Sequence, residues 1–250
     1  MVREKATQDG EVPVPSSLPT YLALSDLIAG EFADCSPGTT LPGEHDLARR
    51  FGVNRLTARA AVDELERRWL IRRVRGSGAY TVRRIEYRIG AAYPVSFTEA
   101  MARLGVETTT TAEPPERRAA GTADSHVLGV PLGAPVLVLR RTRHVQGVPA
   151  VVGQSLLAGD LLPGLEDALA AGTSLHAVMK DTYGIEPALG WSQVRMMPPP
   201  PEEARRLALR GRPPLVRMGA RIVDRNSGRY VEVVDQWLRP DYFDVIVEVQ

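Results

Sequence analysis

Apolar residues recur at helical spacing in three stretches near the start of the chain, which predicts three short helices. The first begins at Thr20 and ends near Phe32, and a turn cluster separates it from a second over 42–51. Asn54 has the side chain of a good helix cap, and it precedes a third helix expected to run to about Trp69. The inward-facing positions of this third helix are apolar, namely Ala58, Ala61, Val62 and Leu65.

Two short β-prone runs follow, 70–74 and 79–82, on either side of a glycine turn, and they predict a β-hairpin. Three helices followed by a two-stranded hairpin form a winged helix-turn-helix, in which the N-terminal end of the third helix enters the major groove of DNA. We assign this unit to residues 18–83. Residues 1–17 are polar and aperiodic, and we expect them to be a disordered tail.

The second half of the chain, residues 93–250, follows an expected linker at 84–92 and is dominated by strand patterns. The predicted strands are 107–111, 136–143, 150–156, 189–197, 215–223 and 230–238, with 243–249 closing the sheet. The predicted helices lie between them: Ser96 to about Leu104, near 125–128, near 174–182, and Pro201 to Leu209. This order predicts an α+β domain built on a mostly antiparallel sheet.

The composition excludes several classes of protein. The chain has 250 residues, of which 44% are hydrophobic and 24% charged, as in ordinary soluble proteins. Its one cysteine, Cys35, leaves no internal disulfide and no multi-cysteine zinc site. No apolar run approaches the ~20 residues of a membrane span, and residues 1–15 lack the apolar core of a signal peptide. We therefore expect a soluble, cytoplasmic protein with no membrane partner, metal or cofactor.

Charge is distributed unevenly, although the net charge is only +1. Residues 47–84 contain eleven arginines and three acids, so this stretch carries +8 and the remainder carries −7. Such a run is compatible with solvated helix faces. Clustered arginine is also what phosphate and guanine recognition require, and here it coincides with the predicted reading helix and wing.

The sequence LPGEHDLARRFGVNRLTARAAVDEL, followed by RGSGAYTV, resembles the N-terminal domain of the GntR family of bacterial transcription regulators. The resemblance spans residues 20–83, and it implies that Arg55, Thr57 and Arg59 contact operator DNA. Two positions depart from the family pattern, because His45 stands where an arginine is usual and Asn54 replaces a serine. With the wing included, the expected DNA-binding residues are His45, Asn54, Arg55, Thr57, Arg59, Arg75 and Gly76.

The order of elements in the second half resembles the UTRA domain of the HutC subfamily of these regulators. The segments that carry the resemblance are SFTEAMARLG, VLRRTRHVQGVPA, SLHAVMKDTYGI, EEARRLAL and VEVVDQWLRPDYFDV. The resemblance implies a chorismate-lyase-like fold that binds an effector and forms a homodimer. Ser-Leu-His at 174–176 is further similar to the phosphonate-metabolism regulators of the subfamily.

Arg141 and Arg143 are two positions apart on a predicted strand and therefore share one face of the sheet. Guanidinium groups on an inner face need acidic partners, which either the protein or a ligand supplies. Ser96 lies at a helix start, where free N–H groups favour an anion. The resemblance brings these features into one pocket, with the expected effector-binding residues Ser96, Phe97, Thr98, Arg141, Arg143, Ser174, His176 and Glu232.

These residues also have structural interpretations: Ser96 as a helix cap, the two arginines in surface ion pairs, and His176 as a buried structural histidine. The subfamily often has a glutamate where this chain has Gly153, and a pocket tyrosine where it has Leu238. Losing a carboxylate and a hydroxyl indicates an effector different from the amino-sugar phosphates and histidine-pathway intermediates of better-known relatives.

We therefore expect a homodimeric repressor whose affinity for double-stranded operator DNA is changed by a small anionic effector bearing a phosphate, phosphonate or carboxylate. Two other functions remain open: a DNA-binding regulator with a vestigial, ligand-free sensing domain, and a chorismate-lyase-like enzyme. The sequence has no metal-ligand cluster, nucleophile motif or phosphate-binding glycine loop, so we expect no catalytic residues.

Overall fold

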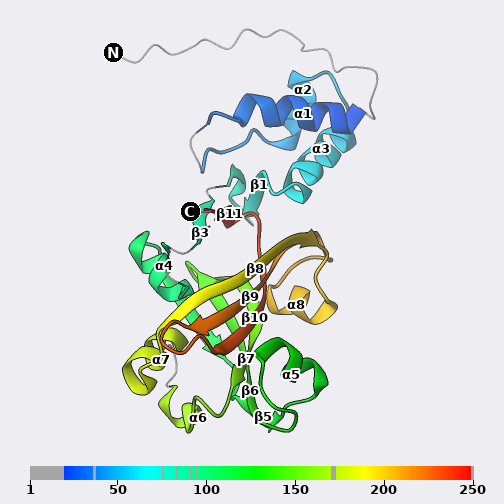
Figure 1. Cartoon of the computed structure of the whole chain (residues 1–250). Helices are drawn as coiled ribbons and strands as arrows, with labels where there is room; N and C mark the ends of the chain where they lie inside the picture. The colour runs from blue at the N-terminus through cyan, green and yellow to red at the C-terminus, as the bar shows by residue number, and fades with distance from the viewer. Residues whose placement is uncertain are drawn as a thin grey trace, which may run out of the picture. The chain divides into compact units, whose positions relative to one another are not determined.

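The computed structural model describes residues 20–35, 38–74, 76–82, 84–90, 92–93, 95–169 and 173–248 (Figure 1). The chain divides into two compact units after Arg84. The expected disordered tail at 1–17 and the expected DNA contact Arg75 lie outside the described residues. Within the described part of the chain, no helix is long and apolar enough to cross a membrane.

The N-terminal unit is a winged helix-turn-helix, as predicted. Its elements are α1 (Thr20–Phe32), α2 (Glu44–Arg50), α3 (Arg55–Arg67), β1 (Ile71–Val74) and β2 (Gly78–Thr81). The expected inward positions of α3 are buried and pack with Leu24 and Ile28 of α1 and Leu47 of α2. The hairpin of β1 and β2 turns at Gly76, whose φ of +77° favours glycine.

The C-terminal unit is built on seven antiparallel strands. These are β4 (Thr108–Ala112), β5 (Glu116–Ala119), β6 (Pro135–Val145), β7 (Val148–Ala158), β8 (Pro187–Met197), β9 (Leu215–Asp224) and β10 (Tyr230–Leu238). Their order across the sheet is β4-β6-β7-β10-β9-β8, and β5 pairs with β6 beside β4. Gln146 and Gly147 both have positive φ in the two-residue turn from β6 to β7, which is the geometry of tight hairpins.

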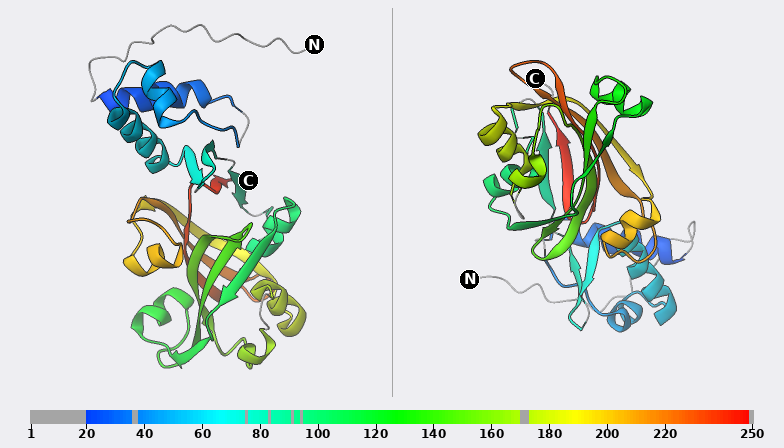
Figure 2. Two further views of the ribbon diagram at one scale, coloured as in Figure 1. Left: turned by 180° about the vertical axis from the view of Figure 1, so that it is seen from behind. Right: turned by 90° about the horizontal axis from the view of Figure 1, so that it is seen from below.

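Helices cover both faces of this sheet. The helices are α4 (Phe97–Arg103), α5 (Thr122–Leu128), α6 (Leu165–Ala168), α7 (Leu175–Tyr183) and α8 (Pro201–Arg206). Leu175 and Met179 of α7 pack against Leu137 and Leu139 of β6, whereas Leu128 of α5 packs with Val136, whose side chain points to the other face. The two views in Figure 2 place α4 and α7 on one face and α5 and α8 on the other.

Two expectations at the ends of this unit were wrong. Residues 85–89 of the expected linker form strand β3 (Ile85–Ile89), and β11 (Phe243–Val247) pairs with β3 in parallel instead of closing the main sheet. The reason is packing: Tyr87 and Phe243 are buried together with Phe97 of α4 in one apolar cluster. The short elements β5 and α6 were not predicted.

Candidate functional site

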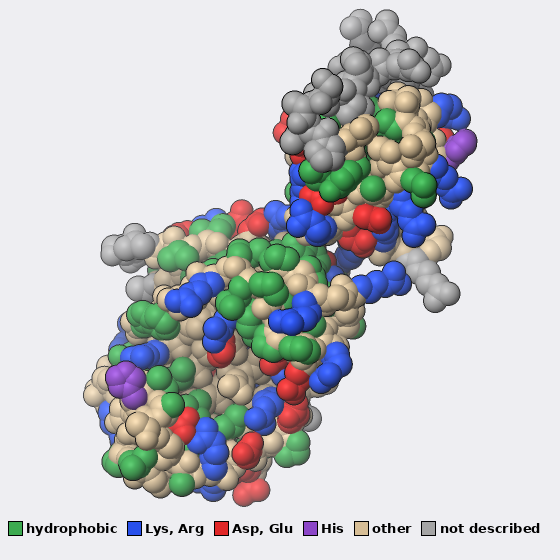
Figure 3. All heavy atoms as spheres, turned by 90° about the vertical axis from the view of Figure 1, so that its right-hand side faces the viewer, with side chains coloured by type: hydrophobic (Ala, Val, Ile, Leu, Met, Phe, Trp, Pro, Cys, Tyr) green, Lys and Arg blue, Asp and Glu red, His purple; other side chains and the backbone are tan. Residues whose placement is uncertain are grey.

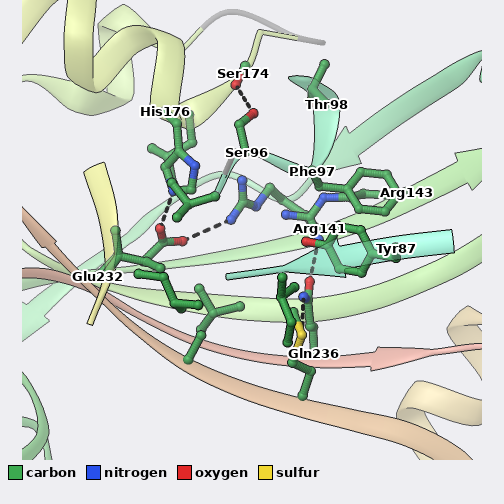
Figure 4. Close-up of a pocket in the computed structure, with 18 of the residues that line it drawn as sticks. Tyr87, Ser96, Phe97, Thr98, Arg141, Arg143, Ser174, His176, Glu232 and Gln236 are labelled. Carbon is green, nitrogen blue, oxygen red and sulfur yellow. Dashed lines mark hydrogen bonds and ion pairs between the residues drawn. The ribbon is translucent and has the colours of Figure 1, made fainter. Parts of the chain in front are cut away.

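A cavity of about 60 Å³ lies in the C-terminal unit. All eight residues expected at the effector line it, and Figure 4 shows how the labelled side chains converge from β6, β10, α4 and α7. The sequence therefore identified residues that meet in space. Their roles toward a ligand stay a prediction.

Glu232 of β10 forms the most connected polar group in the cavity, and it is fully buried. Its Oε1 accepts hydrogen bonds from Ser155 Oγ and from Arg141 Nη2, the latter at 3.3 Å. Its Oε2 lies 2.6 Å from His176 Nε2. Burial by itself would raise the pKa of Glu232, but the charge and hydrogen bond of His176 and the charge of Arg141 outweigh it and lower the pKa to about 2. Because an ionised carboxylate only accepts hydrogen bonds, His176 Nε2 carries a hydrogen.

Arg143 lies beside this network but has no acidic partner among the described residues. Its Nη1 donates to Gln236 Oε1 at 3.0 Å, and its Cζ stands 5.1 Å from the centroid of the Phe97 ring. Burial and the like charge of Arg141 lower the pKa of Arg143 to about 9, so the guanidinium is still charged at neutral pH. A charged, buried guanidinium held by an amide and an aromatic ring can still form charge-assisted hydrogen bonds with an acidic group.

Two serines begin the helices at the cavity. Ser96 Oγ accepts a hydrogen bond from Glu99 N at 3.3 Å and caps α4, and Ser174 Oγ accepts one from Ala177 N at 3.4 Å and caps α7. The two hydroxyl oxygens lie 3.1 Å apart. Both serines are thus helix caps and cavity residues at once. Thr98 lines the cavity but is exposed.

Neither position at which the chain departs from the subfamily lines this cavity, which corrects our interpretation of them. A Cβ on Gly153 would stand 2.4 Å from Asp235 O and 2.6 Å from Gln236 Cα, so glycine allows β7 and β10 to approach closely. Leu238 is fully buried in the apolar cluster around Phe243. Neither position therefore contributes a side chain to the cavity of this chain, and the glycine at 153 has a packing reason of its own.

The structure adds three polar groups that the sequence did not single out: Gln236 and Tyr87, which line the cavity, and Ser155, which holds Glu232 and Arg141 from behind the lining. Gln236 could have been predicted from the alternation of side chains along a strand. It lies four residues after Glu232, which was already selected, and residues two or four apart on a strand share a face. Ser155 and Tyr87 carry no comparable signal, since each looks like any other strand residue in the sequence.

The N-terminal unit presents its expected DNA contacts at the start of α3. Arg55 and Arg59 are exposed, as are His45 on α2 and Gly76 at the wing tip, and Thr57 is half-buried. Asn54 is exposed and caps α3, because its Oδ1 accepts a hydrogen bond from Thr57 N at 2.8 Å. That oxygen therefore uses one of its two lone pairs in the cap, and its second lone pair and its amide N–H groups remain to contact DNA.

Ion pairing divides the arginines of this unit into two groups. Several are held by carboxylates, as the pairs Arg49–Asp46, Arg50–Glu31, Arg67–Glu64, Arg68–Glu64 and Arg73–Asp63 show. Arg55 and Arg59 have no such partner among the described residues. Figure 3 shows basic side chains projecting from this unit. The positive charge that is free to meet DNA phosphates or bases therefore includes the first turns of α3.

Leu56 was missed by the sequence reasoning. It stands between Arg55 and Thr57 with 77% of its surface exposed, more than any other large apolar residue described. It falls outside the apolar positions that α3 buries, and that mismatch is the signal that could have revealed it. An exposed apolar side chain at the start of a reading helix suits contact with a thymine methyl group.

Comparison with known proteins gives two family matches. The UTRA domain matches residues 103–244, and the bacterial regulatory proteins of the gntR family match residues 20–81. The uncharacterized HTH-type transcriptional regulator YurK of Bacillus subtilis is 26% identical over 175 residues, which are 69% of this chain and 72% of YurK. The probable transcriptional regulator PhnF of Escherichia coli is 31% identical over 160 residues, 64% of each chain. The crystal structure of PhnF from Mycobacterium smegmatis has the same fold, with a TM-score of 0.63 at 24% identity over 91% of this chain and 99% of that one.

Proposed function

The chain belongs to the gntR family of bacterial regulatory proteins that carry a UTRA domain, and we propose that it is a repressor released from its operator by a small acid. It is a DNA-binding transcription regulator, and its class binds operator DNA and a small-molecule effector. The identity of the effector as an acid, the homodimer and the direction of the response are our proposals. Operator DNA lies in the cytoplasm of a bacterial cell, and we infer that the protein acts there.

The observation that carries the proposed effector class is Arg143. It is a charged guanidinium buried at the cavity without a carboxylate partner among the described residues. An uncompensated buried charge destabilises the folded protein, and an anion that enters the cavity removes that penalty. The nearby hydroxyls of Ser96 and Ser174 supply neutral hydrogen-bond donors for the oxygens of a carboxylate, phosphate or phosphonate.

On the DNA side, we propose that Arg55, Thr57 and Arg59 contact bases in the major groove. Arg55 and Arg59 lie one turn apart on one face of α3 and are free of acidic partners in the described chain. Arginine pairs bidentately with guanine, and each good pair contributes about 1–3 kcal/mol of discrimination. His45, the amide of Asn54 and the wing at Gly76 would add contacts to the backbone or to neighbouring bases.

We propose that two copies bind through their C-terminal units and present two reading helices to a near-palindromic operator. Strand β8 supports this, because it forms an edge of the main sheet and pairs with β9 alone among the described strands. It exposes the apolar side chains of Trp191, Val194 and Met196. Uncovered apolar edge strands associate readily. Replacing Val194 and Met196 together with glutamate should convert a dimer in sedimentation velocity into a monomer.

Strand β3 offers a route from the cavity to the DNA-binding unit. Tyr87 and Ile89 of β3 line the cavity, and the strand begins directly after the junction at Arg84. The Tyr87 ring packs edge-on against Phe97, with their centroids 5.7 Å apart, and Arg143 lies over the same Phe97 ring. A ligand that shifts Arg143 would therefore disturb β3. If that changes the spacing of the two α3 helices in the dimer, the protein loses affinity for an operator that fits only the original spacing.

We propose that the protein has no catalytic activity of its own. The single carboxylate described at the cavity, Glu232, is held by three donors and is not poised as an acid or base. Among the described residues, no group of three or more His, Cys, Asp or Glu side chains could hold a metal ion.

The experiment that tests this function has two parts. Sequencing the DNA retained by the purified full chain defines the operator, and thermal unfolding against a panel of small acids and neutral metabolites defines the effector. A ligand that binds only the folded state raises the melting temperature. The proposal requires that an acid which raises the melting temperature also weakens operator binding. It fails if the acids that stabilise the protein leave operator affinity unchanged.

A further inference from the structure

The charges around the cavity restrict the effector further than its being an acid. On the basis of the function proposed above, we infer that the effector carries one acidic group and no positively charged group, and that the remainder is small and uncharged. Among the described lining residues there are two guanidinium groups, Arg141 and Arg143, one imidazole, His176, and one carboxylate, Glu232.

Glu232 is not available to a ligand. Its two oxygens accept hydrogen bonds from Ser155, Arg141 and His176, so three donors already surround one buried carboxylate. A ligand ammonium group in this cavity would find no free acidic partner among the described side chains. Burying a charge without a partner is strongly unfavourable, so amino acids and other amino-bearing effectors are disfavoured.

The two arginines differ in whether an acidic side chain balances their charge. Arg141 is compensated by Glu232 at 3.3 Å, whereas Arg143 is held by the Gln236 amide and the Phe97 ring and has no acidic partner in the described part of the chain. One acidic group on the ligand therefore suffices to balance Arg143. A second acidic group would lie beside Glu232 and lack a free cation, because Arg141 and His176 are both already engaged by that carboxylate.

The rest of the cavity lining explains why the remainder of the effector is small and uncharged. The sheet contributes the apolar side chains of Leu189, Met218, Ala220, Ile222 and Val234. The cavity volume of about 60 Å³ holds roughly four to six water-sized groups, at ~10–15 Å³ each. A short organic phosphonate, phosphate ester or carboxylate with an uncharged end fits both observations.

The test uses pairs of acids that have the same shape and differ in the charge of one end. Ethylphosphonate is compared with aminomethylphosphonate, and propanoate with glycine, because each pair exchanges a methyl group for an ammonium group. Malonate and phosphonoacetate replace the same methyl group with a second acid. Dissociation constants for the full chain at pH 7.5 come from calorimetry, with thermal unfolding as a second readout.

We expect the methyl-ended member of at least one pair to bind about tenfold or more tightly than its ammonium-ended and diacid counterparts. The pair that responds distinguishes a phosphonate-like head group from a carboxylate. Equal or tighter binding of the ammonium-ended or diacid member overturns the inference while the acid-binding function stands. Binding of none of the six, at concentrations where the protein is folded, contradicts the acid-binding function itself and the inference with it.

Glu232→Gln provides a second, independent readout. The substitution leaves Arg141 without its counter-ion, so the affinity for malonate relative to propanoate should rise by about tenfold at temperatures where the variant is folded. Asp235→Asn is the matched control, because Asp235 is on the same strand but forms a half-exposed ion pair with Arg217 instead. An unchanged ratio in folded Glu232→Gln would overturn the charge balance argued above.

Discussion

The Arg143 guanidinium lies over the ring of Phe97, with its Cζ 5.1 Å from the ring centroid, and both side chains are buried at the cavity. The ring offers the cation a weak electrostatic partner, and the Gln236 amide offers another, but neither neutralises the charge. The cavity is therefore built around an incomplete ion pair. Replacing a buried charge with apolar residues is often stabilising, so the presence of this group at the cavity favours a ligand-binding role over a purely structural one.

The first prediction concerns how much the buried charge of Arg143 destabilises the folded protein. Replacing Arg143 with Met and Gln236 with Leu together removes the buried charge and the amide that it would leave unpaired. We expect the double variant to be more stable than the wild type by about 1 kcal/mol, or roughly 2–4 °C in melting temperature, and to lose its response to the effector. Differential scanning calorimetry with and without effector measures both effects.

Arg140→Met is the control for that experiment. Arg140 is the neighbour of Arg141 on β6, points to the opposite face, and forms a partly exposed pair with Glu116 at 3.4 Å. It should change the melting temperature little and keep the effector response. A double variant that is markedly less stable than the wild type would show that Arg143 is structural.

The second prediction concerns Glu232 and pH. Its pKa is lowered to about 2 in the folded protein, so ionised Glu232 stabilises the fold above its ordinary pKa of about 4.5, and this contribution is lost as the pH falls toward 2. Glu232→Gln should lower the free energy of unfolding by about 3–5 kcal/mol at neutral pH, because it leaves Arg141 buried without a counter-ion.

Urea denaturation of both proteins between pH 3 and 7 checks this prediction. The difference between wild type and Glu232→Gln should shrink as the pH falls below about 4.5, since protonation removes the same charge from the wild type. Asp235→Asn, on the same strand, should cost at most about 1 kcal/mol, as expected for a half-exposed pair. A pH-independent difference would argue against an ionised Glu232.

The third prediction concerns Arg59. Its substitution by alanine should remove most of the specific operator affinity and leave effector binding intact. One arginine–guanine pair is worth about 1–3 kcal/mol, so the two copies in the proposed dimer together supply about 2–6 kcal/mol of a margin over non-specific DNA of about 4–10 kcal/mol. Fluorescence anisotropy with labelled operator and with a scrambled duplex measures the loss. Arg67→Ala on the same helix is the control, because Arg67 is paired with Glu64 at 2.6 Å. Footprints retained at wild-type concentrations would contradict the assignment.

The fourth prediction concerns Leu56. If this exposed side chain contacts a thymine methyl group, replacing that thymine of the operator with uracil should weaken binding of the wild-type protein by about fourfold. This factor corresponds to the burial of roughly one methylene group. Leu56→Ala should bind both duplexes equally. Leu132→Ala, which removes another highly exposed leucine in the C-terminal unit, should behave as the wild type. A uracil effect that survives Leu56→Ala would assign the contact to another residue.

How far the sequence predicted the structure depends on the kind of interaction involved. Local signals were sufficient for α3, whose cap Asn54 and buried positions appear as expected, and for the hairpin of β6 and β7. The strand at 85–89 was overlooked, although Ile85, Tyr87 and Ile89 alternate with polar residues, because its partner β11 lies far away in the sequence. Strand β5, Glu116–Ala119, is exposed throughout and has no apolar alternation to reveal it.

The cavity residues also divide into those that local signals predicted and those that they did not. The spacing of two between Arg141 and Arg143 placed both on one face of a strand, and the family resemblance supplied the residues from other elements. The pairing of Arg141, and not Arg143, with Glu232 could not be predicted, because it depends on the diagonal positions of β6, β7 and β10 that bring Ser155 and Glu232 together. Gly153 was misread for a related reason, since the approach of the β10 backbone that requires glycine is visible only in three dimensions.

The most direct test of the proposed function measures operator affinity as a function of effector concentration for the wild type and for Arg143→Met. The operator is the sequence selected by the purified protein, and the effector is the acid that stabilises the wild type most. We predict that both proteins bind the operator equally well without effector, and that the acid releases the wild type but not Arg143→Met. Release of Arg143→Met at the same acid concentration would contradict the proposed function, because the response would then not depend on an anion at Arg143.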